Sequence, residues 1–193
     1  MSGHSRWSQI KHKKGITDKK RGQLFSKLSK LISLAARKGA DPLSNLELKN
    51  AIEQARSFNM PSESIERAIK KISDKSAAQL EELSMEAIGP GGIALRIKAI
   101  TDSHNRTISE VKKILNDHGS KMVPPGSISW MFTPHLKTED SKISESNQSL
   151  SAGFNQPITI TNPDIQAQIN KLFEALDDHD DVEDVTSNLQ EQV

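Results

Sequence analysis

The 193-residue chain contains no cysteine, which excludes disulfide bonds and thiolate metal sites. No stretch approaches the roughly 18 consecutive apolar residues of a membrane-spanning helix. The N-terminus also lacks an apolar segment of the signal-peptide kind. Hydrophobic residues make up 34% of the chain and charged residues 26%, which is ordinary for a water-soluble fold. We therefore expect a cytoplasmic protein of one large or two small domains, without a membrane partner.

The net charge of +1 conceals a strong separation of charge along the chain. Residues 1–38 carry eleven Lys or Arg against one acid, residues 39–134 carry twelve of each, and residues 135–193 carry three against twelve. Charge sorted in this way suggests an anionic partner at the N-terminal end. The acidic end either discourages nonspecific binding or folds back on the basic end, and the sequence leaves both alternatives open.

The most basic stretch is residues 3–21, GHSRWSQIKHKKGITDKKR, with seven Lys or Arg, one acid, one Trp and two His. A nucleic-acid backbone attracts such a run, because each neutralised phosphate releases condensed counterions. The alternative is a solvated tail without a partner. Trp and His side chains can also stack on unpaired bases, which favours RNA slightly.

The helix expected from residue 17 to Lys38 has an apolar stripe made of Leu24, Leu28, Leu31, Ile32 and Ala35. At ~100° per residue, another side of the helix carries only positive charge, from Lys19, Lys20, Lys27, Lys30, Arg37 and Lys38. Solvated helix faces usually interleave the two signs. This stripe, roughly 25 Å or more in length, therefore extends the basic tail.

Two more helices complete a predicted three-helix bundle. Ser44 and Glu47 form a capping-box pattern for a helix that ends near Phe58. Pro61 suits the first turn of the next helix, which presents further basic residues outside, namely Arg67, Lys70 and Lys71.

After a polar joint the hydrophobic pattern changes to the period of strands. Residues 85–88 and 93–101 are predicted to pair in a hairpin, and residues 89–92, GPGG, form its turn. This turn lacks the GK[ST] ending of a phosphate-binding loop, so we interpret it as structural. A helix capped by Asp102 or Asn105 then runs to Gly119, and residues 127–132 (SISWMF) alternate like a strand.

The remaining third of the chain is more polar. Residues 135–156 have the composition of a linker. A short strand is expected at residues 157–161, followed by a helix with Asn162 as its cap and Pro163 at its first position. The acidic run DDHDD, residues 177–181, then precedes a last strand that begins at Val182.

Two other functional classes are weighed against nucleic-acid binding. A hydrolase would use His104 or the DDHDD run, but Asp102, Ser103 and His104 lie on one loop, whereas a catalytic triad must converge in space. The DDHDD run lacks EF-hand spacing, so we expect no metal and no cofactor. A protein-interaction module would use the acidic C-terminal region to bind a basic partner.

Several motifs in a fixed order resemble the YebC/PmpR family, which includes the mitochondrial translational activator of cytochrome oxidase. They are GHSRWSQIKHKK, DKKRGQLFSKL, NMPSESIERAIKK, GPGG, NRTISEVK and ALDDHDDVEDV. The resemblance runs through Phe132 and resumes near Pro157. The family typically has a further α/β domain between these points, where this chain has about two dozen polar residues. This chain also has MEAIGPGG in place of an aromatic-rich YEGYGPGG, and His104 where Arg is common.

The resemblance implies a helical N-terminal domain followed by α/β domains, no catalysis, and a role in gene expression. Family members have been described as DNA-binding transcriptional regulators and as translation factors that help ribosomes through difficult stretches. Carried over by position, the family's basic signature falls on nine residues: Arg6, Trp7, Lys11, His12, Lys13, Lys14, Lys19, Lys20 and Arg21.

We therefore predict an α+β fold in which a three-helix bundle precedes an α/β sandwich of the ferredoxin-like type. The predicted parts are a basic tail (1–16), the bundle (17–76), the α/β domain (77–134 and 157–193) and a linker (135–156) that replaces the family's inserted domain. The expected partner is ribosomal RNA on the ribosome, with promoter DNA as the alternative, and the oligomeric state is left open. Besides the nine signature residues, the predicted nucleic-acid contacts are Lys27, Lys30, Arg37 and Lys38, with further phosphate contacts at Arg67, Lys70, Lys71 and Arg106.

Overall fold

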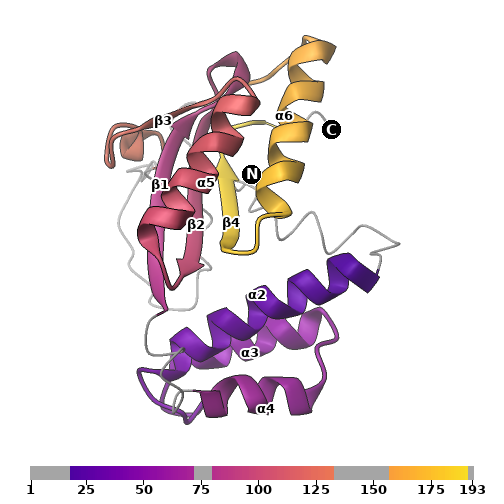
Figure 1. The fold of residues 1–193 in the computed structure, drawn as a ribbon, viewed down its shortest axis with the longest axis vertical. Coiled ribbons are helices and arrows are strands. Elements are labelled where there is room, and N and C mark those ends of the chain that lie inside the picture. The colour runs from indigo at the N-terminus through magenta and orange to yellow at the C-terminus, as the bar shows by residue number, and fades with distance from the viewer. Residues whose placement is uncertain (1–17, 72–79, 133–156, 191–193) are drawn as a thin grey trace, which may run out of the picture.

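The computed structural model describes residues 18–71, 80–132 and 157–190 (Figure 1). Three parts of the prediction lie outside the described residues. They are the linker at 135–156, the side chain of Lys19, and the nucleic-acid contacts predicted in the tail, namely Arg6, Trp7, Lys11, His12, Lys13 and Lys14. Among the helices of the described residues, none is long and apolar enough to cross a membrane.

Three helices form the N-terminal group, as predicted. They are α2 (Asp18–Ala36), α3 (Leu46–Ser57) and α4 (Ser62–Lys70). Their apolar faces meet in one buried cluster, in which Leu28, Ile32 and Leu48 are fully buried. The apolar stripe read from the sequence of α2 is therefore the stripe that packs against α3 and α4.

The cap of α3 differs from the prediction. Asn45, not Ser44, is the N-cap, and its Oδ1 accepts a hydrogen bond from the backbone N–H of Leu48. Its Nδ2 donates to two carbonyl groups of the preceding segment, those of Ala35 and Gly39. Ser44 instead donates to the Asp41 carbonyl, and Glu47 pairs with Lys38. Asn45 is the cap because its buried side chain, between the end of α2 and the start of α3, can bond three backbone groups at once.

The C-terminal group is a two-layer α/β sandwich, which confirms the predicted fold class. Its antiparallel strands are β1 (Glu81–Ile88), β2 (Ala94–Thr101), β3 (Lys121–Val123) and β4 (Val182–Ser187), in the order β3-β1-β2-β4. The helices α5 (His104–Asp117) and α6 (Pro163–Asp177) lie on one face of the sheet (Figure 1). Leu95, Ile97, Leu115, Leu172 and Leu176 are among the fully buried residues between these layers.

The GPGG segment forms the turn of the β1–β2 hairpin and contains the short 3-10 helix η3 (Pro90–Gly92). The Gly89 N–H donates to the Ile93 carbonyl and the Gly92 N–H donates to the Gly89 carbonyl. These two amides are used within the turn, which supports a structural interpretation over a phosphate loop. Gly91 has φ +71°, and a Cβ there would lie 2.6 Å from Cδ1 of Ile160.

The predicted strand at residues 127–132 is wrong, because this segment ends in the 3-10 helix η4 (Ser129–Phe132). The buried carboxylate of Glu86 on β1 accepts hydrogen bonds from Ile128 N at 3.0 Å and from Ser129 Oγ at 2.6 Å. Burial alone would raise the pKa of Glu86, but these hydrogen bonds outweigh it and lower that pKa. The Glu86 carboxylate thus stabilises the start of η4, and Ile128 and Phe132 pack in one buried cluster.

Three smaller differences concern strand ends and caps. The strand β3 was not predicted, and the strand expected at residues 157–161 is reduced to an isolated bridge between Ile158 and Leu189. Ser103, not Asp102 or Asn105, occupies the N-cap of α5. The cap of α6 is Asn162 with Pro163 in the first turn, as predicted.

Candidate nucleic-acid interface

Part of the positively charged side of α2 lies against the C-terminal group. Lys20, Lys27 and Lys30, here called the lysine face, contact the end of α6 and the residues that lead into β4. The segment Asp177–Asp181, here called the acidic turn, connects α6 to β4 and faces α2 (Figure 1). Of the two alternatives left open by the sequence, the structure therefore shows that the acidic end folds back on the basic end.

The contacts of the lysine face extend from Lys20 to Lys30, nearly three turns of α2. Lys20 Nζ lies 3.4 Å from Glu174 Oε1 and 3.8 Å from Asp178 Oδ1, and all three side chains are about half exposed or more. Lys30 Nζ donates to the carbonyl of Asp180 at 3.2 Å and to Oδ1 of Asp181 at 2.7 Å. The contact is thus exposed at its Lys20 end, most buried at Lys27 and partly exposed at Lys30.

Lys27 is the buried member of this face. Its Nζ donates to the backbone carbonyl of Asp177, and 9% of the residue is exposed. Burial lowers the pKa of Lys27 despite the nearby carboxylates of Asp177 and Asp180. As the structure stands, Lys27 cannot touch a nucleic acid unless the acidic turn first moves away.

Asp181 is the centre of the contact, although the sequence did not single it out from its acidic neighbours. Its carboxylate accepts hydrogen bonds from Lys30 on α2 and from Arg106 and Thr107 on α5. Burial alone would raise the pKa of Asp181, but these donors hold that pKa well below its ordinary value. No local pattern in the sequence separates Asp181 from its acidic neighbours, because its burial results from the packing of α2 and α5 around it.

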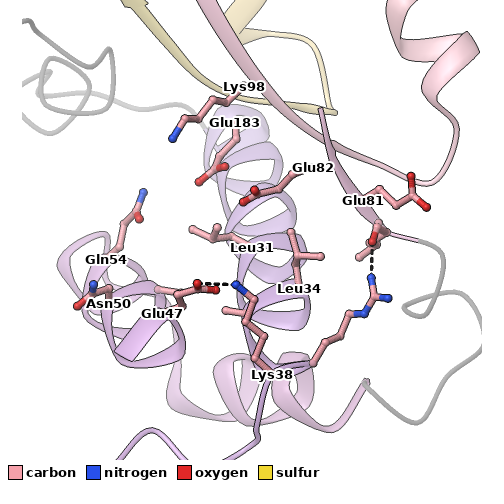
Figure 2. A pocket seen from close by; sticks show the side chains of 14 residues that line it. Leu31, Leu34, Lys38, Glu47, Asn50, Gln54, Glu81, Glu82, Lys98 and Glu183 are labelled. Carbon is pink, nitrogen blue, oxygen red and sulfur yellow. Dashed lines mark hydrogen bonds and ion pairs between the residues drawn. The ribbon is translucent and has the colours of Figure 1, made fainter. Parts of the chain in front are cut away.

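Beyond Lys30 the two groups are separated by a cleft of about 790 Å³ (Figure 2). Figure 2 shows Leu31 and Leu34 of α2 on one side and Glu82, Lys98 and Glu183 from the sheet on the other. Burial, and then the charge of Asp184, raise the pKa of Glu183 to about 7. The sheet therefore contributes a carboxylate that is partly protonated near neutral pH.

Two further predicted contacts of α2, Arg37 and Lys38, are also engaged within the protein. Arg37 donates to the carbonyl of Leu80, and Lys38 Nζ lies 2.5 Å from Oε1 of Glu47. The Lys38 pair is exposed and visible in Figure 2. Exposed pairs of this kind contribute about 0–1 kcal/mol, so Lys38 can exchange its partner for a phosphate at low cost.

The structure separates the predicted further phosphate contacts into two kinds. Arg67, Lys70 and Lys71 are exposed at the C-terminal end of α4. Arg106 instead binds two carboxylates, at 2.8 Å from Asp102 Oδ1 and 2.9 Å from Asp181 Oδ2. Arg106 is also exposed, but the two carboxylates that it binds belong to this protein, so its charge is already paired in this structure.

The residues weighed for hydrolysis do not converge. Asp102 pairs with Arg106, while His104 Nε2 lies 3.0 Å from Glu81 Oε2 on β1. Both His104 and Glu81 are exposed. The loop thus lacks the chain of hydrogen bonds by which a carboxylate orients a histidine toward a serine.

Among the residues that the structure describes, one group of side chains, Glu110, His179 and Asp181, brings ligand-type atoms within 4.8 Å of one another. His179 Nδ1 accepts the N–H of Asp181, so Nε2 carries the proton and donates it to Glu110 at 2.9 Å. Neither ring nitrogen then has a lone pair for a metal, and Lys30 and Arg106 supply the positive charge beside Asp181. The group is better explained as a hydrogen-bonded part of the acidic turn.

Comparison with known proteins identifies the family. The model of the TACO1/YebC protein N-terminal domain matches residues 5–75, and that of the TACO1/YebC second and third domain matches residues 80–137. A "probable transcriptional regulatory protein" of Chloroflexus aurantiacus is 51% identical over 135 residues, covering 68% of this chain and 54% of the relative. The chain thus spans about half the length of that relative.

Two further comparisons extend over the whole chain. A protein of Desulforamulus reducens with the same description is 35% identical over 242 aligned positions, with all of both chains covered. Since this chain has 193 residues, the alignment places additional residues in the relative, in keeping with a shortened member. A crystal structure of a conserved hypothetical protein from Aquifex aeolicus matches with a TM-score of 0.75 at 30% identity, covering 97% of this chain and 98% of that one. This chain therefore belongs to the TACO1/YebC family.

Proposed function

We propose that this protein is a non-catalytic, nucleic-acid-binding regulator of gene expression. The observation that carries the proposal is the sorting of charge, with eleven Lys or Arg against one acid in residues 1–38 of a TACO1/YebC family member. Lys and Arg side chains bind the phosphates of a nucleic acid, and the release of condensed counterions favours this binding. Such binding needs no catalytic group. A second exposed group of cations lies in the same N-terminal group of helices. It consists of Arg67 and Lys70 on α4 and of Lys71 directly after it.

Ribosomal RNA is our preferred target. The basic stretch contains Trp7, His4 and His12 among its cations, and flat side chains stack on the unpaired bases that RNA loops display. Regulation would then act on translation, at the ribosome.

Promoter DNA is the second candidate, because the relatives from Chloroflexus aurantiacus and Desulforamulus reducens are described as probable transcriptional regulatory proteins. Phosphate contacts occur with both polymers, so the lysines themselves do not discriminate. Base-specific contacts from side chains in a groove would be required for a promoter.

Binding to purified ribosomes and to duplex DNA, each measured over a series of salt concentrations, tests the proposal. We expect tighter binding to ribosomes and a steep fall in affinity with salt. Equal, sequence-independent affinity for both polymers would contradict either specific target, and the absence of binding at low salt would contradict the function itself.

The basic tail has its own test. Replacing Lys11, Lys13 and Lys14 with Ala should weaken binding and reduce the slope of log affinity against log salt by about one unit per lost contact. Replacing Lys112, Lys121 and Lys171, which lie on the α/β unit, removes the same charge elsewhere and serves as the control. An unchanged slope in the tail variant would exclude these lysines from the interface.

A further inference from the structure

We propose that the acidic turn is an intramolecular competitor of nucleic acid for the lysine face of α2, and that binding requires this turn to move away. The inference rests on the proposed nucleic-acid-binding function and adds a form of regulation to it. The turn presents carboxylate and carbonyl oxygens to Lys20, Lys27 and Lys30, which are donors that a phosphate backbone would otherwise bind.

The first argument is direct occupancy. Lys27 is buried beneath Asp177, and Lys30 is held by the Asp180 carbonyl and the Asp181 carboxylate. A lysine ammonium has three donors, but a polyanion can approach the buried Lys27 only through the space that the acidic turn occupies. Phosphate contact is therefore excluded at Lys27 while the turn is in place, and at the partly exposed Lys30 a phosphate competes with the two Asp oxygens.

The second argument is that the contact is polar and flanked by solvent-accessible space. Within the described residues, the apolar cluster of the helices and that of the α/β sandwich have no member in common. Hollows of about 790 and 750 Å³ lie along the junction, lined by charged residues of both groups. Without a shared apolar core, the junction relies on charge, and charge pairs at exposed positions weaken with salt and with competing polyanions.

The third argument concerns which acids can be changed without damage. Asp181 also binds Arg106 and Thr107 within the α/β unit, so its removal would disturb the fold itself. Asp178 and Asp180 are exposed, and neither side chain supports a strand or a core. The variant Asp178→Asn/Asp180→Asn therefore weakens the competitor and leaves the anchor in place.

The test compares this variant with wild type and with Glu53→Gln/Asp164→Asn, which removes two exposed carboxylates far from the lysine face in sequence. The probes are purified ribosomes and a mixed-sequence duplex DNA at low salt. We expect the acidic-turn variant to bind about 2- to 10-fold more tightly than the control variant, because two carboxylates no longer compete. Equal affinity of the two variants would overturn the inference. Absence of binding by all three proteins would instead overturn the proposed function.

A second measurement follows the movement itself. The chain lacks cysteine, so Glu53→Cys on α3 and Gln168→Cys on α6 accept a pair of spin labels without other reaction sites. The distribution of distances between the labels should lengthen when ribosomes or DNA saturate the protein. An unchanged distribution at saturation would overturn the proposed movement, even if the affinities differ.

Discussion

Lys30 Nζ lies 2.7 Å from Oδ1 of Asp181, and this pair joins the N-terminal helices to the α/β sandwich. Only 6% of the Asp181 side chain is exposed, against 27% for Lys30, so the carboxylate is the more desolvated partner. Arg106 and Thr107 complete its hydrogen bonds. One acid thereby links α2, α5 and the start of β4.

Asp181→Asn should destabilise the protein by about 2–4 kcal/mol, because it leaves Lys30 and Arg106 without their shared carboxylate. Urea denaturation at neutral pH measures the loss. Asp180→Asn, at an exposed side chain, serves as the control and should stay within about 0.5 kcal/mol of wild type. The low pKa of Asp181 means that its contribution is present at neutral pH and is lost only as the solution becomes strongly acidic. Equal stability of both variants would contradict the central role of Asp181.

Glu183→Gln should stabilise the protein at pH 8 and have a smaller effect at pH 5. The pKa of Glu183 is raised to about 7, so folding takes up a proton in the window between about 4.5 and 7. Stability of the wild type therefore falls as pH rises through that window, and a side chain that cannot ionise avoids this fall. We expect a gain of about 1–3 kcal/mol at pH 8 by thermal or urea denaturation. Exposed Glu53→Gln is the control, and a gain independent of pH would contradict the assignment.

Asn45→Ala should cost about 2–3 kcal/mol, since it removes the cap of α3 and two further hydrogen bonds to carbonyl groups. Ser44→Ala tests the capping box predicted from the sequence. Because Ser44 bonds only to Asp41, we expect a change below about 0.5 kcal/mol. Thermal unfolding of the two variants distinguishes these caps, and a larger loss for Ser44→Ala would restore the original prediction.

Gly91→Ala and Gly92→Ala compare crowding with backbone strain in the hairpin turn. Both positions have positive φ, +71° and +78°, where a side chain is disfavoured by about 1 kcal/mol. Only at Gly91 does the added Cβ meet a neighbour, at 2.6 Å from Cδ1 of Ile160. We expect Gly91→Ala to be the more destabilising variant by about 1–2 kcal/mol in urea denaturation. Equal losses would show that Ile160 gives way freely.

Local patterns in the sequence determined most of the elements of this protein. The apolar spacing of Leu24, Leu28 and Ile32 identified the buried face of α2, and alternation in residues 93–101 identified β2. Asn162 followed by Pro163 marked the start of α6. These signals are reliable because they depend on neighbours within a few residues along the chain.

Only the tertiary structure decided what the charges do. The segment at residues 127–132 alternates like a strand, but Glu86, more than 40 residues earlier, supplies the carboxylate that holds its helical turn. Likewise, the sequence shows a basic helix and an acidic run about 150 residues apart, and packing sets Lys27 and Lys30 against that run. Charge composition determines that a basic end exists. Whether its lysines meet solvent or a carboxylate depends on which surfaces the two cores bring together, and that is a property of the fold.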